Sequence, residues 1–331
     1  MGMSQVKTHP VAGTDYPRTL QEFDEWFSND EKCVQYLQRL RWPTGFCCPV
    51  CGGNKGWEMA TGLLRCSMCK HKASVIAGTI FEKTRKPLRV WFQAMWYVTS
   101  QKFGGNALGL KRILGLGSYQ TAWSWLHKMR KAMVRPGRDQ LGGIVEIDET
   151  LVGGVDKGGK RGRGAERKSI VVIALEIHDP KGYGRVRMQR VLDVSGNSLI
   201  PFVQSVVLPG TEVRTDCWGG YNTLAECGYI HKATNLSDSE DPAHVVMPGV
   251  HRIASLLKRW LLGTHQGAVS SKHMDYYLDE YTFRFNRRAS KARGLLFYRL
   301  LQQAVTTSPL AYKEIVHGRA GEKERQGQLN G

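Results

Sequence analysis

The chain has 331 residues, enough for two or three domains with at least one sizeable hydrophobic core. Hydrophobic residues make up 41% of it, which excludes an intrinsically disordered chain. Lys and Arg outnumber Asp and Glu by 47 to 29, giving a formal net charge of +18. An excess of this size indicates a polyanionic partner, most commonly nucleic acid, although a basic protein with a solvated surface is the alternative.

Membrane and export signals are missing from the sequence. No run of about 18 apolar residues is present, which predicts no membrane span. The N-terminal segment lacks the apolar core of a signal peptide. We therefore expect an intracellular, cytoplasmic protein with no membrane partner. In a reducing compartment, closely paired cysteines indicate metal ligation and not disulfides.

The first elements expected along the chain are two helices within residues 19–42. Phe23, Trp26 and Phe27 recur at helical spacing, and a second apolar run follows Asn29, which is suited to an N-cap. The segment 63–81 is expected to form short strands.

Two C-x-x-C pairs follow these helices, separated by fourteen residues. Each pair fits a tight turn, and two such turns supply four thiolates to a tetrahedral, structural Zn²⁺. Cys47 and His71 are alternative ligands, but only Cys48 has the right spacing to Cys51, and His71 follows a complete set. Whether this ribbon contacts DNA or only supports its neighbour stays open. The predicted zinc ligands are Cys48, Cys51, Cys66 and Cys69.

A helix-turn-helix is predicted next. A helix with an apolar face begins near Pro87, and two shorter helices at 106–114 and 118–133 are separated by a glycine-containing turn. Asn106 and Ser118 occupy the N-cap positions. A structural hairpin is the alternative to a DNA reader. The side chains expected to reach a groove or phosphates are Tyr119, Gln120, Trp123, Lys128 and Arg130.

Beyond residue 142 the pattern changes to strands. Three strand-like runs are followed by a helix, a fourth strand, a short run and a long helical region. That order predicts an α/β domain with a mixed sheet covered by helices. The polar, Gly-rich tail after about residue 313 is expected to be disordered. The runs lie at 143–154, 169–177, 185–194, 197–208, 211–216, 228–234 and 249–288.

Two aspartates stand near the ends of apolar strands. A carboxylate placed there is costly unless it binds a cation or gains hydrogen bonds. Asp148 lies in the run IVEIDET and Asp216 ends the run EVRTD. An aspartate that caps a turn is the alternative for each, but as a pair they are typical of carboxylates that hold a divalent metal.

The chain resembles the insertion-sequence transposases that carry an N-terminal zinc ribbon and a ribonuclease H-like domain with an Asp-Asp-Glu type triad. The resemblance spans about residues 17–305. It implies a zinc ribbon (17–82), a helix-turn-helix (86–135), and an α/β ribonuclease H-like catalytic domain (142–305), followed by the tail (313–331). The motifs that carry it are CPVCGG, CSMC, IDETLVGG with KRGRG, TDCWGGY, HRIASLLKRWLLGTHQG and YLDEYTFRFNRR.

The resemblance also implies the site residues. Asp148 and Asp216 match the first two metal-binding carboxylates, and the third position falls on His251, where many relatives have Glu or Asn. Lys258 matches the basic residue that follows. This is the pattern of a subgroup with Asp, Asp, His and Lys, and it implies Mg²⁺ or Mn²⁺, of which Mn²⁺ tolerates nitrogen better. The alternatives for the third ligand are Asp238, Glu240 and Asp241, in a run that is more simply a solvated loop.

Basic residues gather where DNA is expected. The Gly-rich loop after the Asp148 strand is one strip, with a solvated surface loop as its alternative, and the C-terminal helices hold the other. The candidate DNA contacts are Lys160, Arg161, Arg163, Arg259, Arg284, Arg287 and Arg288.

The function expected is a DNA transposase that binds the terminal inverted repeats of an insertion sequence. It cleaves the ends and transfers the 3′-OH to double-stranded target DNA by two-metal phosphoryl transfer. A homodimer is the minimal assembly, because two ends are joined in one event. The alternatives are a DNA-binding regulator with an inactive nuclease-like domain, and a metal-dependent nuclease.

Overall fold

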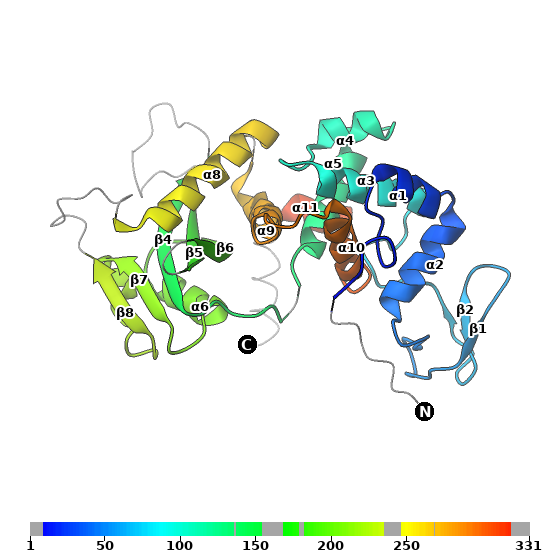
Figure 1. Ribbon diagram of the computed structural model, residues 1–331, viewed down its shortest axis with the longest axis horizontal. Coiled ribbons are helices and arrows are strands. Elements are labelled where there is room, and N and C mark those ends of the chain that lie inside the picture. Colours follow the sequence, from blue (N-terminus) through cyan, green and yellow to red (C-terminus); the bar gives the residue numbers. More distant parts are fainter. Residues whose placement is uncertain are drawn as a thin grey trace. The chain divides into compact units, whose positions relative to one another are not determined.

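The computed structural model in Figure 1 describes residues 9–135, 137–153, 168–178, 182–234, 246–267 and 269–318. The chain divides into two compact units. The N-terminal unit consists of Met1–Arg135 and Ala289–Tyr312. The sheet unit consists of Pro136–Arg288 and Lys313–Gly331.

The N-terminal unit contains six helices among its described residues. The break expected between the first two is present, because the Asn29 side chain caps the second helix by accepting from the backbone N–H of Lys32 at 3.0 Å. The third begins at Leu88, directly after Pro87. These helices are α1 (Leu20–Trp26), α2 (Asp30–Arg41), α3 (Leu88–Ser100), α4 (Ala107–Ile113), α5 (Tyr119–Ala132) and α10 (Arg293–Ala304).

A small antiparallel sheet follows α2 in the sequence. Its strands are β1 (Gly56–Glu58), β2 (Leu64–Cys66) and β3 (Lys72–Ala73), in the order β1-β2-β3. Strands were expected over 63–81, but residues 74–81 form turns in which the Thr79 hydroxyl donates to the carbonyl of Ile76. β1 lies before the expected range. It was not predicted because its three residues are exposed and show no apolar alternation.

Aromatic rings fill the core of the N-terminal unit, and one of them comes from the far end of the sequence. Phe297 of α10 packs against Phe23, Phe92 and Trp96, with ring centroids 5.5–5.8 Å apart. The expected catalytic domain extended to residue 305. That boundary is wrong, because the apolar face of α10 is buried against α3 and joins the N-terminal unit.

The sheet unit is built on five strands in the order β6-β5-β4-β7-β8. The first three in the sequence pair antiparallel, whereas β4 pairs parallel with β7 and β7 with β8. This confirms the expected α/β domain with a mixed sheet. The strands are β4 (Ile144–Val152), β5 (Ser169–Ile177), β6 (Tyr183–Val191), β7 (Glu212–Asp216) and β8 (Ile230–Thr234).

Helices cover both faces of this sheet (Figure 1). On one face, α8 (Pro248–His265) and α9 (Met274–Phe285) pack on alternate residues of β5 and β6. On the other face, α6 (Gly196–Val206) packs on Val145 and Ile147 of β4. Each fully buried aliphatic side chain contributes about 1.5–3 kcal/mol, so these two apolar layers fix the positions of the helices.

The end of the described chain differs from expectation. Residues after about 313 were predicted to be disordered, but α11 spans Tyr312–His317. Ile315 is fully buried, and its carbonyl lies 2.8 Å from Nε2 of His273, which explains why this short polar segment is ordered. The remainder of the expected tail lies outside the described residues. Every helix that the structure describes is too short or too polar for a membrane span.

Candidate functional site

The four predicted zinc ligands converge. Their sulfur atoms all lie within 4.8 Å of one another, and Sγ–Sγ distances are 3.6 Å for Cys48–Cys69 and for Cys51–Cys66. Cys47, the alternative ligand, is exposed and directs its thiol to the carbonyl of Gly52 at 3.8 Å. The arrangement matches the closed, structural thiolate site that Zn²⁺ prefers.

The two cysteine turns have the same backbone design. In each, the first cysteine carbonyl accepts from a residue with positive φ, Gly52 (73°) in one turn and Lys70 (62°) in the other. A Cβ at Gly53 would lie 2.7 Å from the sulfur of the exposed Met68 side chain, which would have to shift to admit one. Backbone N–H groups, first that of Cys69, lower the pKa of Cys66 to about 7, which favours the thiolate that binds metal.

Asp148 and Asp216 lie on two neighbouring strands, β4 and β7. β4 and β7 are parallel, with Ile144 opposite Glu212 and Glu146 opposite Arg214. Continued two residues beyond these pairs, the same register would set Asp148 opposite Asp216, and side-chain alternation would direct both toward the face covered by α8. Both carboxylates are partly exposed.

Each carboxylate is also held by a backbone N–H. Asp148 Oδ1 accepts from Glu149 at 2.8 Å, and Asp216 Oδ1 accepts from Trp218 at 3.1 Å. The turn-capping role considered for Asp216 is therefore real, and it coexists with the pairing of the two strands. These bonds orient the carboxylates.

His251 joins the aspartates from α8. Its Nε2 lies 3.8 Å from Asp148 Oδ2, and within the described part of the chain this shielded nitrogen makes no hydrogen bond. Lys258 is two helical turns further along α8. Partial burial, with Lys168 nearby, lowers the pKa of Lys258, while the Asp148 carboxylate acts in the opposite direction. Asp148 therefore lies within the electrostatic reach of both α8 residues.

The aspartate–histidine set is looser than the cysteine set. Among the described residues, only the four cysteines place ligand atoms of three or more groups within 4.8 Å of one another. Even so, two carboxylates on one face and an imidazole nitrogen with no hydrogen bond form a donor set that a divalent cation fits. The acidic alternatives Asp238, Glu240 and Asp241 lie outside the described residues.

Three further residues around Asp148 were not identified from the sequence. Glu146, only 4% exposed, accepts from the backbone N–H of Val250 at 3.0 Å. Burial raises the pKa of Glu146, against the lowering effect of the Val250 and Gly249 N–H groups. Glu149 accepts a hydrogen bond from the hydroxyl of buried Tyr221. Burial, then the Glu149 carboxylate, raises the pKa of Tyr221 well above its ordinary value, so the phenol stays protonated.

A cavity of about 380 Å³ adjoins His251 along α8. Arg252, Ser255 and Arg259 line it from the same helix, and Tyr183 lines it from β6. The two arginines are exposed. Arg259, a predicted DNA contact, therefore opens onto a basic hollow beside the candidate metal ligands.

The predicted helix-turn-helix forms, with both expected N-caps. Asn106 accepts from Gly109 N–H at 2.8 Å, and Ser118 from Thr121 N–H at 3.1 Å. Tyr119 is 52% exposed and Gln120 is also exposed, whereas Lys128 is partly buried. Arg130 was expected to reach DNA, but that expectation is wrong here because its side chain lies on the buried side of α5, at 2% exposure.

Three predicted DNA contacts at the end of α9 differ from one another. Arg284 is not free for DNA, because its guanidinium bonds the fully buried Glu280 at 2.9 Å and is itself only 12% exposed. Arg287 stacks over Phe283, and the exposed Arg288 stacks over Phe285, each at 4.0 Å. The remaining predicted contacts, Lys160, Arg161 and Arg163, lie outside the described residues.

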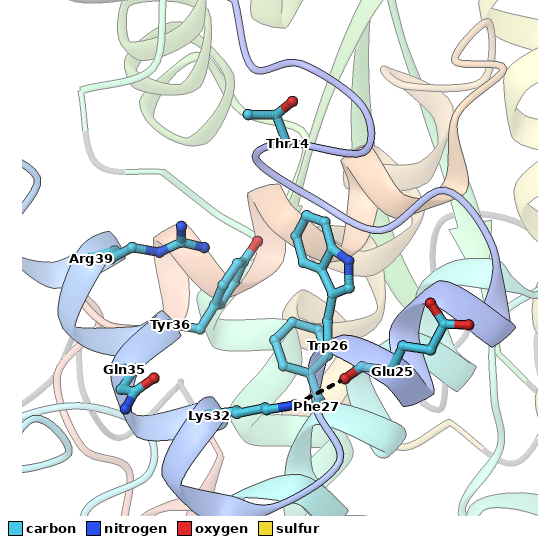
Figure 2. Close-up of a pocket in the computed structure, with 8 residues that line it drawn as sticks. All are labelled: Thr14, Glu25, Trp26, Phe27, Lys32, Gln35, Tyr36 and Arg39. Carbon is cyan, nitrogen blue, oxygen red and sulfur yellow. Dashed lines mark hydrogen bonds between the residues drawn. The ribbon is translucent and has the colours of Figure 1, made fainter.

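A second, larger cavity, of about 530 Å³, lies within the N-terminal unit, between α1 and α2. Figure 2 shows Trp26 and Tyr36 on its walls, and Lys32 donating to the carbonyl of Glu25 at 3.4 Å. The Arg39 guanidinium lies over the Tyr36 ring, 5.0 Å from its centroid. None of the candidate metal ligands lines this cavity.

Comparisons with known proteins match two segments of the chain. Residues 28–72 match the transposase zinc-ribbon domain, and residues 140–286 match the ISXO2-like transposase domain. An uncharacterized protein in transposable element ISH50 of Halobacterium salinarum is 28% identical over 280 residues, which cover 78% of this chain and 91% of that protein.

Among solved structures, the catalytic core domain of BIV integrase covers 46% of this chain and 89% of its own. It is 15% identical, and its TM-score of 0.31 is too low to bear on the fold. The two domain matches come in the order expected from the sequence. Together the two matches identify a transposase zinc-ribbon domain at residues 28–72, followed by an ISXO2-like transposase domain at residues 140–286.

Proposed function

We propose that this chain is a DNA transposase that binds the inverted repeats at the ends of an insertion sequence, cleaves them and transfers the freed 3′-OH to target DNA. The observation that supports the proposal is the parallel pairing of β4 with β7, because the same register, continued two residues past Glu146 and Arg214, would set Asp148 opposite Asp216. His251 Nε2, at 3.8 Å from Asp148, completes a three-part donor set.

Asp148, Asp216 and His251 would hold Mg²⁺ or Mn²⁺. Two such ions, when bound, activate an attacking oxygen and stabilise a leaving one in an in-line displacement at phosphorus. The backbone N–H groups of Glu149 and Trp218 each bond one carboxylate oxygen, and this restricts the direction of the other. The donor set contains nitrogen, so Mn²⁺ is expected to bind more tightly than Mg²⁺.

Lys258 is the second residue of α8 for which we propose a role. Its ammonium group lies on the same helical face as His251, two turns away. There it would neutralise a phosphate next to the scissile bond, as a cation does in phosphoryl transfer. Burial, with Lys168 nearby, lowers the pKa of Lys258, and the Asp148 carboxylate opposes this and so favours the charged amine.

DNA is proposed to contact both units. Tyr119 and Gln120 at the exposed start of α5 are the candidates for the helix-turn-helix, with Lys128 further along it. In the sheet unit, the candidates are Arg259, Arg287 and Arg288, and the basic loop with Lys160, Arg161 and Arg163. A homodimer or larger assembly would bring two element ends together.

A supercoiled donor plasmid that carries the element ends, incubated with Mg²⁺ or Mn²⁺, tests the proposal. End cleavage followed by joining is the expected result. Asp148→Ala and Asp216→Ala should each abolish both steps while DNA binding in a gel-shift assay is retained. Asp193→Ala is a matched control, because Asp193 also follows a strand and bonds a backbone N–H two residues ahead, that of Ser195 at 2.9 Å.

The same assay decides between the two other functions. Cleavage without joining would indicate a nuclease. Binding without cleavage would indicate a regulator. The support for that hypothesis is that the third ligand position holds a histidine and not an acidic residue. Full joining activity in both aspartate variants would show that the site is elsewhere.

A further inference from the structure

Glu146 connects the strand of Asp148 to the helix of His251. α8 begins with Pro248, and Met247 at its N-cap provides no side-chain hydrogen bond, so the first N–H groups of this helix need an acceptor from elsewhere. Glu146 supplies it by accepting from Val250 at 3.0 Å, across 104 residues of sequence. Val250 directly precedes His251, so this bond fixes the start of α8 beside β4.

Gly249 makes this contact possible. A Cβ at this position would lie 2.6 Å from Glu146 Oε2 and 2.8 Å from side-chain atoms of Leu175 and Ile177. Residue 249 must therefore have no side chain for α8 to approach the sheet this closely. The separation between His251 and Asp148 depends on that approach.

Glu149 makes the corresponding connection to the turn that carries Asp216. It follows Asp148 directly, and strand alternation directs its side chain to the opposite face. There it accepts from the hydroxyl of Tyr221, which ends the 3₁₀ turn η1 (Gly219–Tyr221) that follows Asp216. Tyr221 is fully buried in the core beneath α6.

We propose that Glu146 and Glu149 are positioning residues that set the spacing of the three metal ligands. Each flanks Asp148 and bonds the backbone or side chain of one of the segments that bring the other two ligands. Glu146 holds α8 and hence His251, whereas Glu149 holds the turn after Asp216. This inference rests on the proposed metal site, and neither glutamate is itself assigned as a ligand.

Tyr221→Phe tests the Glu149 connection, because it removes one hydroxyl and keeps the ring in the core. Tyr229→Phe is the matched control, since Tyr229 is buried in the same core and its hydroxyl donates to Val207 at 3.2 Å, away from the site. Mn²⁺ binding to the zinc-loaded full chain is measured by water-proton relaxation, together with Tm. We expect Tyr221→Phe to weaken Mn²⁺ binding roughly tenfold, the scale of outer-shell changes around metals.

Gly249→Ala tests the Glu146 connection, with Gly263→Ala as its control in the same helix. A Cβ at Gly263 meets nothing within 4 Å. We expect Gly249→Ala to weaken Mn²⁺ binding roughly tenfold or more, whereas Gly263→Ala leaves it unchanged. A merely structural role would lower Tm in both test variants and leave the Mn²⁺ affinity of the folded protein intact, which would overturn the inference.

Asp148→Ala separates failure of this inference from failure of the metal site. If Asp148→Ala loses Mn²⁺ binding while Tyr221→Phe and Gly249→Ala keep it, the metal site stands and the positioning roles are wrong. If Asp148→Ala binds Mn²⁺ as the unaltered protein does, the proposed site itself is wrong, and the positioning roles fall with it.

Discussion

The zinc ribbon and the aspartate–histidine site are assembled in different ways. Cys48 and Cys69 are 21 residues apart, and each cysteine pair is shaped by its own short turn. Asp148, Asp216 and His251 come from two strands and a helix, and a contact that fixes the helix spans 104 residues. Local spacing is sufficient for the first site, whereas the second depends on the whole sheet unit.

The two sites also differ in how closely their ligand atoms approach. The four sulfur atoms all lie within 4.8 Å of one another, but the aspartate–histidine set does not reach that spacing. Neighbouring carboxylates repel one another, and a catalytic site has to leave positions for substrate oxygens. A closed site suits a structural ion, and a looser one suits ions that also bind DNA.

Replacing a zinc ligand should have the largest effect. Cys48→Ser is expected to release the metal and unfold the ribbon, since structural Zn²⁺ contributes on the order of 10 kcal/mol to such folds. Zinc content and proteolysis within residues 48–69 are the measurements. Cys47→Ser is the control, because Cys47 is exposed and outside the cluster. Retention of zinc by Cys48→Ser but not by Cys47→Ser would reassign the ligand.

His251 should be the next most sensitive position. His251→Ala is expected to slow end cleavage roughly 10- to 100-fold, because one ligand is lost while both carboxylates remain. His251→Glu should restore cleavage in Mg²⁺, the ion that prefers oxygen. Single-turnover cleavage rates in Mg²⁺ and in Mn²⁺ give the comparison. Equal rates for all three proteins would exclude His251 from the metal site.

Removing the Glu176–Arg185 ion pair should destabilise the sheet unit without affecting the zinc ribbon. Burial would raise the pKa of Glu176, but hydrogen bonds from the Arg185 side chain and N–H lower it overall. Because the folded pKa lies below the unfolded one, this stability is present above about pH 4.5 and is lost as pH falls. Glu176→Gln should cost about 1–2 kcal/mol at pH 7, a reduced value because Arg185 is 37% exposed.

Urea unfolding of the sheet unit, followed by its aromatic fluorescence, gives this value. Zinc content should not change in Glu176→Gln. A variant that lost zinc together with sheet stability would show that the two regions do not fold independently.

The smallest effect is expected at a DNA contact. Arg259→Ala should reduce the slope of log affinity against log salt by about 1, the change for one phosphate contact. Binding to the element ends at several salt concentrations measures it. Arg18→Ala is the control, because exposed Arg18 already pairs with Glu22 at 2.5 Å on α1. An unchanged slope in Arg259→Ala would show that DNA does not contact Arg259 in the basic hollow beside His251.

The sequence was sufficient to predict the structure where one residue type determines the local geometry. The C-x-x-C spacing predicted the zinc ligands, and Asn106 and Ser118 predicted the starts of two helices correctly. The strand-like runs at 143–154, 169–177 and 185–194 correctly predicted the strands β4, β5 and β6.

Long-range packing explains what was missed. Arg130 and Arg284 resemble DNA contacts in the sequence, but one is buried and the other pairs with buried Glu280. The helix at 293–304 continues a basic, helical region, and only its aromatic contacts show that it belongs with the N-terminal unit. Glu146 was missed because its partner, the N–H of Val250, is a backbone group distant in sequence.

The central claim is that Asp148 and Asp216 hold divalent cations jointly. A double-mutant cycle of Asp148→Asn and Asp216→Asn, with Mn²⁺ affinity measured by electron paramagnetic resonance, tests it most directly. We predict that each single variant loses most of the affinity and that the double variant is little worse, because the two side chains serve one site. Singles that bind Mn²⁺ as tightly as the unaltered protein, or losses that simply add, would contradict the claim.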